Sequence, residues 1–142
     1  VVEHLASGAA PMPFSLGLHP YFAISDLKAV SIQGLPSQCC NHLTMETAST
    51  AEQLLCMANG VDLLAGPASS VTLRDAAANT AIELQLQAPL DLAVVWSEPP
   101  RPMVCLEPWT APRGSLASGD RCLWLNPGDS MRLQCRYRLL EA

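Results

Sequence analysis

Two short segments of the sequence each carry one side chain suited to proton transfer. His19 lies within the run Gly17-Leu18-His19-Pro20-Tyr21-Phe22, and Glu107 lies within Val104-Cys105-Leu106-Glu107-Pro108-Trp109-Thr110. A histidine gives up or takes a proton near neutral pH, whereas an ionised carboxylate accepts one. The pair could therefore act as acid and base on one neutral substrate, and this chemistry requires no metal.

The neighbours of these two residues restrict how they move. Pro20 and Pro108 push His19 and Glu107 toward extended backbone, so both side chains are expected to project from a strand or a strand end. Aromatic residues close to them in the sequence are expected to form apolar walls that exclude water. These walls would consist of Tyr21, Phe22 and Trp109.

Each residue also has a purely structural interpretation. His19 could be a buried histidine whose ring is satisfied by a backbone carbonyl, because many perturbed titratable groups serve structure. Glu107 could be a solvated charge at a strand end. The apolar Val104-Cys105-Leu106 before it favours instead a buried carboxylate that needs a partner.

Composition limits the class of protein to which such a pair could belong. The 142 residues are 49% hydrophobic, which fits a single domain over residues 1–142 with a substantial core. A net charge of −5 would repel a phosphate backbone, so nucleic acid is not expected as a partner. No apolar run approaches the ~20 residues of a membrane span, and no secretion signal is recognisable, so we expect a cytoplasmic protein without a membrane partner.

The cysteines point to the same compartment. The chain has six, an even number that would permit disulfides in an exported protein. Cys105 and Cys135 fall at core-facing positions of alternating segments, and no zinc-like spacing of Cys or His occurs. Reduced thiols that pack as small apolar residues are therefore expected.

Hydrophobic alternation predicts an all-β protein. Residues 81–87 and 131–139 alternate apolar with polar side chains, and residues 30–33 and 71–74 do so more briefly. Residues 92–96 are apolar throughout, as expected for a strand covered on both faces. These segments, separated by turns rich in Gly and Pro, predict an antiparallel β-sandwich.

One segment has helical features. Ser49 and Glu52 have the spacing of a capping box, and residues 50–58 contain good helix formers. The same short stretch could equally line a loop or a strand.

Four segments, taken in order, carry a resemblance to a known family. The sequence resembles the aldose 1-epimerase (galactose mutarotase-like) superfamily over nearly the whole chain, and within it the branch of glucose-6-phosphate 1-epimerase-like proteins. The segments are Pro13 to Phe22, Gly60-Val61-Asp62-Leu63-Leu64, Val104 to Pro112, and Leu125-Asn126-Pro127-Gly128-Asp129-Ser130.

The resemblance implies a β-supersandwich and interconversion of the α and β anomers of a hexose or a hexose 6-phosphate, without a cofactor or a metal. By this resemblance His19 corresponds to the catalytic acid, Glu107 to the catalytic base, and Asp62 to a carboxylate that holds substrate hydroxyls. Glu107 would take the proton of the C1 hydroxyl while His19 donates one to the ring oxygen. The ring then opens, rotates about C1–C2 and recloses with the roles exchanged.

Further residues are candidates for substrate contact, and some have alternative interpretations. Tyr21 and Trp109 could cover the sugar ring, and Arg113 could meet a sugar or phosphate oxygen, although a lone arginine beside a glycine is often only exposed. Asp62 also lies in an ordinary turn sequence, where Asp serves local hydrogen bonding. Four residues are expected to be structural, on the surface or in the core: His4, His42, Trp96 and Trp124.

The chain differs from the family in length. Family members are about twice as long, and their amino-terminal half adds a histidine and an arginine to the sugar site. The chain begins Val1-Val2-Glu3 without a methionine. We therefore expect either the carboxy-terminal half of a supersandwich or a short homologue completed by another copy or another subunit. Half a sandwich would expose strand edges and apolar faces, so a homodimer or larger assembly is predicted.

Three functions from different classes are compatible with the sequence. The first is a sugar epimerase that uses His19 and Glu107. The second is a carbohydrate-binding module that keeps the cleft without turnover. The third is a structural or interaction domain in which the two side chains point away from each other.

Overall fold

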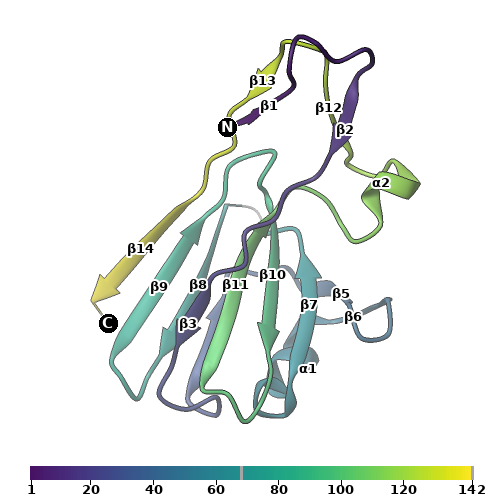
Figure 1. Ribbon diagram of the computed structural model, residues 1–142. Helices are drawn as coiled ribbons and strands as arrows, with labels where there is room; N and C mark the ends of the chain where they lie inside the picture. Colours follow the sequence, from purple (N-terminus) through teal and green to yellow (C-terminus); the bar gives the residue numbers. More distant parts are fainter. Residues whose placement is uncertain (68, 142) are drawn as a thin grey trace.

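The body of the protein is a sandwich of two antiparallel β-sheets (Figure 1). The computed structural model describes residues 1–67 and 69–141. The larger sheet has six strands in the order β3 (Tyr21–Ala23), β11 (Met103–Trp109), β10 (Leu92–Ser97), β7 (Val61–Ala65), β5 (Gln38–Asn41) and β6 (Glu46–Ser49). The other has four, in the order β14 (Arg136–Glu141), β9 (Thr80–Gln85), β8 (Ser70–Asp75) and β4 (Val30–Gln33).

Two small sheets extend beyond one end of the sandwich (Figure 1). In one, β1 (Val2–Glu3) pairs with β13 (Ser130–Met131), and in the other β2 (Met12–Phe14) pairs with β12 (Leu123–Leu125). The described residues also contain three short helices: α1 (Thr50–Leu55), η1 (Met57–Asn59) and α2 (Ser115–Ser118). None of the helices in this part of the chain is long and apolar enough to cross a membrane.

The predicted all-β sandwich is confirmed, and most of its expected strands are present. The segments predicted at 30–33, 71–74, 81–87 and 92–96 correspond to β4, β8, β9 and β10. Ser49 also caps the helix as its spacing with Glu52 suggested, because the Oγ of Ser49 accepts a hydrogen bond from the amide of Glu52 at 3.4 Å. Helix α1 begins directly after this cap.

The continuous strand predicted at residues 131–139 is wrong. The chain leaves the small sheet after β13 and enters the four-stranded sheet only at β14, and residues 132–135 belong to neither. Side chains nevertheless alternate between half-buried and exposed from Met131 to Arg138. The alternation therefore reported the direction of the side chains correctly, but it could not show that the hydrogen-bonded partner changes from β1 to β9.

The hydrophobic core fills the space between the two large sheets. Alternate residues of β7, β10 and β11 face residues of β4, β8 and β9 across it, and burial of each large aliphatic side chain stabilises the fold by roughly 1.5–3 kcal/mol. The core includes Leu63, Val95, Leu106, Leu73 and Leu84.

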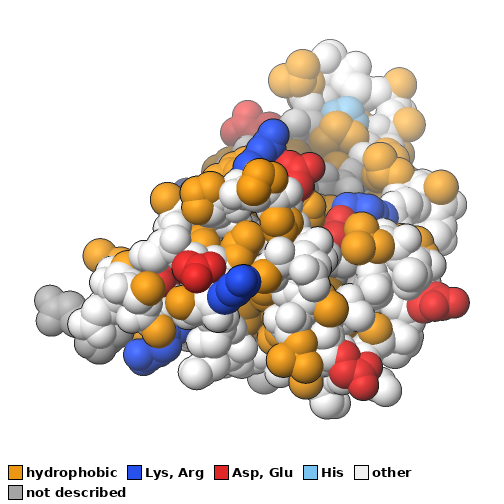
Figure 2. Space-filling view, turned by 90° about the horizontal axis from the view of Figure 1, so that it is seen from below, with side chains coloured by type: hydrophobic (Ala, Val, Ile, Leu, Met, Phe, Trp, Pro, Cys, Tyr) orange, Lys and Arg blue, Asp and Glu red, His pale blue; other side chains and the backbone are white. Residues whose placement is uncertain are grey.

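The surface is mixed in character. On the face shown in Figure 2, acidic and basic side chains are scattered among apolar and uncharged ones. The six cysteines are free thiols; Cys105 is fully buried and Cys135 half-buried.

Candidate active site

One face of the six-stranded sheet points away from the core and carries the polar residues of the site. The register places Trp96 of β10 directly opposite Asp62 of β7 on one side and Cys105 of β11 on the other. Cys105 in turn lies opposite Tyr21 of β3. Because residues directly opposite each other project from the same face of a sheet, these four side chains form one row across it.

A second row follows from the same register. Glu107 lies two residues after Cys105 on β11, and His19 lies two residues before Tyr21. Because the strands are antiparallel, Glu107 and His19 lie opposite each other on the same face as the first row. A bridge between Gly17 and Trp109 continues the pairing beyond the end of β3. His19 and Glu107 are therefore cross-strand neighbours, although 87 positions separate them in the sequence.

Backbone hydrogen bonds hold the segment before β3 against β11. The amide of Leu18 donates to the carbonyl of Pro108 at 3.1 Å, and the amide of Thr110 donates to the carbonyl of Leu16 at 2.9 Å. The Oγ1 of Thr110 accepts from the amide of Leu16 at 2.9 Å. This segment thus behaves as an extension of the sheet and gives His19 a fixed backbone.

Gly17 is required by the ring that packs on it. A Cβ atom at this position would lie 2.7 Å from Cδ1 of Trp109, closer than side-chain contacts allow. A larger residue would therefore displace the Trp109 ring, whose Nε1 donates a hydrogen bond to Oε2 of Glu107 at 2.9 Å.

The centre of the site is the contact between His19 and Glu107. The Nδ1 atom of His19 lies 3.4 Å from Oε1 of Glu107. Glu107 is almost completely buried, whereas half of the His19 side chain is exposed. The His19 ring stacks on Tyr21 with centroids 4.8 Å apart and meets the Trp96 ring edge-on at 5.6 Å, so its orientation is fixed from two sides.

Burial sets the protonation behaviour of Glu107. Loss of hydration raises the pKa of this carboxyl, and the hydrogen bond from Trp109 and the nearby His19 act in the opposite direction. A carboxylate with a raised pKa is a stronger base than an exposed one and can hold a proton for return to a substrate.

Replacing Trp109 with Phe is expected to raise the pKa of Glu107 further. The substitution keeps an aromatic ring but removes the N–H donor that stabilises the ionised carboxylate. A ¹³C NMR titration of the Glu107 side-chain carboxyl would measure the change. Trp124→Phe is the matched control, since Trp124 is exposed on β12 and should leave the titration unmoved. An unchanged or lower midpoint in Trp109→Phe would contradict the assignment of this hydrogen bond.

A second polar cluster surrounds Asp62 on β7. Its Oδ1 lies 2.8 Å from Nδ1 of the buried His42, and its Oδ2 accepts a hydrogen bond from Nη2 of Arg113 at 2.8 Å. Burial lowers the pKa of His42 despite the neighbouring carboxylate. An ionised carboxylate only accepts hydrogen bonds, so the proton of neutral His42 is assigned to Nδ1.

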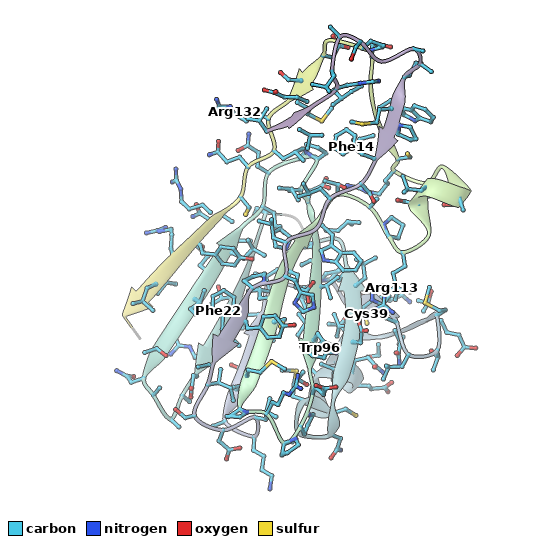
Figure 3. All side chains as sticks on the ribbon, in the orientation of Figure 1. Phe14, Phe22, Cys39, Trp96, Arg113 and Arg132 are labelled. Carbon is cyan, nitrogen blue, oxygen red and sulfur yellow. The ribbon has the colours of Figure 1, made fainter. Side chains whose placement is uncertain are left out.

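Two adjoining pockets open over these clusters. One has a volume of about 380 Å³ and the other about 340 Å³, and both lie in the range of small-molecule sites. They share four lining residues: His19, Glu107, Trp109 and Arg113. In Figure 3, Arg113 reaches from the loop after β11 toward β7. The arrangement can bind a polar ligand and move protons on it.

The structure brings together most of the residues singled out from the sequence. His19, Glu107, Asp62, Trp109 and Arg113 all line one or both pockets, and Tyr21 supports His19 by stacking. The turn interpretation of Asp62 is wrong, because Asp62 is a strand residue of β7.

Three expectations need correction. Phe22 does not wall the site, because the alternation of β3 turns it toward Tyr137 on the core side. Trp124 is 58% exposed and does not belong to the core. Cys105 is buried, as expected, but on the site face of the sheet instead of the core face.

Two site residues were not recognised from the sequence. His42 was expected to be structural or on the surface, yet it contacts Asp62; Trp96 was expected in the core, yet it lines one pocket. Trp96 ends the apolar run of β10, and that run predicted a side chain in the core instead of one in the site. For His42 the only signal in the sequence is its position two residues beyond a short apolar segment. That position does not predict a place in the site unless the pairing of β5 with β7 is known.

The family of the chain follows from a sequence comparison. The profile of the aldose 1-epimerase family matches residues 2–138, which is nearly the whole chain. The chain belongs to the aldose 1-epimerase family. A search of curated protein sequences found no significant match.

Solved structures share the fold of this chain. The Slr1438 protein from Synechocystis sp. PCC 6803 is 26% identical with a TM-score of 0.87, over 95% of this chain and 47% of that one. A galactose mutarotase-like protein from Clostridium acetobutylicum is 16% identical with a TM-score of 0.72, over 94% of this chain and 49% of that one, and shares the fold. The aldose 1-epimerase family chain described here thus spans about half the length of these structures.

Proposed function

We propose that the protein interconverts the α and β anomers of an unphosphorylated hexose by acid–base ring opening. The observation that carries this proposal is the 3.4 Å contact between Nδ1 of His19 and Oε1 of Glu107 at the wall of a pocket. Membership of the aldose 1-epimerase family supports the same reaction.

The geometry suits the reaction because its two proton transfers occur at neighbouring atoms. In a pyranose the C1 hydroxyl oxygen and the ring oxygen are bonded to the same carbon, so the base and the acid must stand close together. Glu107 takes the proton of the C1 hydroxyl while His19 donates one to the ring oxygen, and the C1–O5 bond breaks to give an aldehyde. After rotation about C1–C2 the roles reverse, and both side chains return to their starting protonation states.

Substrate hydroxyls are assigned to the Asp62 cluster. Each carboxylate oxygen of Asp62 already accepts one hydrogen bond, from His42 or from Arg113, and retains capacity for another. The two donors fix the orientation of the carboxylate, and its oxygens can still accept a hydrogen bond from a sugar hydroxyl. Trp109 offers an apolar ring at the pocket wall that can cover the nonpolar face of the pyranose.

The charge of the site favours a neutral sugar over a sugar phosphate. Among the described residues that line the two pockets, Arg113 is the only lysine or arginine, and Asp62 already pairs with it. The buried carboxyl of Glu107 adds further negative potential. A phosphate group of nearly two negative charges would need a free cation or a set of amide donors to offset this repulsion.

Exchange NMR on the full 142-residue chain tests the proposal. Saturable acceleration of α/β exchange of glucose or galactose is expected, with weaker acceleration for hexose 6-phosphates. Saturable binding without faster exchange would replace the proposal with a carbohydrate-binding module. A preference for the phosphates would overturn the assignment of the neutral sugar, and neither binding nor acceleration would overturn the function as a whole.

A further inference from the structure

The site contains a buried thiol that the proposed reaction does not use. Cys105 lies two residues before Glu107 on β11 and projects from the same face of the sheet. One potential ligand atom from each of His19, Cys105 and Glu107 lies within 4.8 Å of the other two. An imidazole, a thiol and a carboxylate therefore lie close together: His19 and Glu107 line the pocket, and Cys105 is fully buried.

We propose that His19, Cys105 and Glu107 form a binding site for a thiophilic divalent cation such as Zn²⁺, and that the bound ion inhibits the protein. The inhibitory part rests on the proposed function, because the ion would occupy the lone pairs of the acid and the base. The binding part is independent of any activity.

The distance between His19 and Glu107 suits two ligands of a tetrahedral ion, and the Cys105 sulfur lies within 4.8 Å of both ligand atoms. Zinc binds imidazole nitrogen and carboxylate oxygen at about 2.0–2.2 Å and thiolate sulfur at about 2.3 Å, which places the ligand atoms about 3.5 Å apart. The His19 and Glu107 atoms are already 3.4 Å apart. Three protein ligands would leave a fourth coordination position for water or a sugar hydroxyl.

The donor set selects the kind of ion. Mg²⁺ and Ca²⁺ prefer several oxygen ligands, and this cluster offers one carboxylate. A thiolate and an imidazole instead favour Zn²⁺ and similar borderline or soft cations. Discrimination against the hard cations is therefore an expected property of the site.

The surroundings permit the ion to enter and to be held. Half of the His19 side chain is exposed, which gives access from the pocket, while Cys105 and Glu107 are buried. Burial and the adjacent Glu107 raise the pKa of the Cys105 thiol to about 12, so the ion must displace a proton. A cation of charge +2 stabilises the thiolate directly, and Asp62 adds a negative charge close to Glu107.

The test is a titration of the reduced, metal-free full chain with Co²⁺ and Zn²⁺. Co²⁺ bound to a thiolate gives a sulfur-to-metal charge-transfer absorption, and Zn²⁺ should displace it at one equivalent. Isothermal titration calorimetry would give the affinity for Zn²⁺ and, in parallel, for Mg²⁺. We expect the absorption band, one tight Zn²⁺ site and at least about 100-fold weaker Mg²⁺ binding.

Variants locate the site. Cys105→Ser and Cys105→Ala should each abolish the charge-transfer band and weaken Zn²⁺ binding by at least about 100-fold, since loss of even an outer partner of a metal ligand costs about 10–100-fold. Cys56→Ser is the matched control, because Cys56 is an exposed cysteine at the end of α1 and outside the cluster. It should retain both the band and the affinity.

Each result supports or overturns a defined part of the proposal. Absence of the band in the wild-type chain, or its persistence in both Cys105 variants, would overturn the site. Zn²⁺ binding that depends on Cys105 but leaves anomer exchange unchanged would overturn the inhibition alone. If the wild-type chain shows no anomer exchange, the spectroscopic titration still decides whether the metal site exists.

Discussion

Glu107→Gln is expected to slow anomer exchange by about 10²–10⁴-fold, the usual contribution of a positioned proton-transfer group. The amide has the shape of the carboxyl and can still accept the hydrogen bond from Nε1 of Trp109, but it cannot take the proton of the C1 hydroxyl. Exchange NMR at saturating sugar measures the effect. Because the amide preserves hydroxyl contacts, the sugar dissociation constant should change much less than the rate.

The pH dependence gives this prediction a second readout. The base must be ionised, and burial raises the pKa of Glu107, so the wild-type rate should fall with decreasing pH at a higher pH than an ordinary glutamate would cause. The residual rate of Glu107→Gln should lack this acid limb. Glu98→Gln is the matched control, because Glu98 is an exposed glutamate paired with Arg101. Equal rates in the wild-type chain and Glu107→Gln would remove Glu107 from the mechanism.

The sequence singled out the central pair through the order of the family-like segments, and local constraints predicted the backbone at both positions. Proline after His19 and after Glu107 predicted extended backbone at both positions, and both lie in or beside paired strands. What the sequence could not supply was the register. A shift of one residue between β3 and β11 would place His19 on the core face, so only the observed pairing makes the two residues neighbours.

Non-local pairing explains the failures as well. His42 joins the site because its amide donates to the carbonyl of Asp62, which continues the pairing of β5 with β7 by one residue and which no local pattern encodes. The segment 131–139 kept its alternation while its partner strand changed, and alternation carries no information about partners. Trp124 is large and apolar, but β12 pairs only with β2 in a small sheet that has too little area to bury it.

His19→Gln is expected to slow anomer exchange by about 10²–10⁴-fold as well, for the complementary reason. Glutamine can donate a hydrogen bond to the ring oxygen but cannot release a proton to it. The measurement is again exchange NMR at saturating sugar. His4→Gln is the matched control, because His4 is near the small sheet at the end of the sandwich, where its Nε2 hydrogen-bonds to the carbonyl of Ala10. Rates that are unchanged in His19→Gln would exclude His19 as the acid.

The double variant Glu107→Gln, His19→Gln distinguishes a coupled pair from two independent groups. Ring opening needs a proton to leave the C1 hydroxyl as another reaches the ring oxygen, so loss of either group should already abolish most of the concerted route. The double variant should then be about as slow as the slower single variant, as found when residues act as one unit. Losses that multiply across the two substitutions would show that the acid and the base act in separate steps.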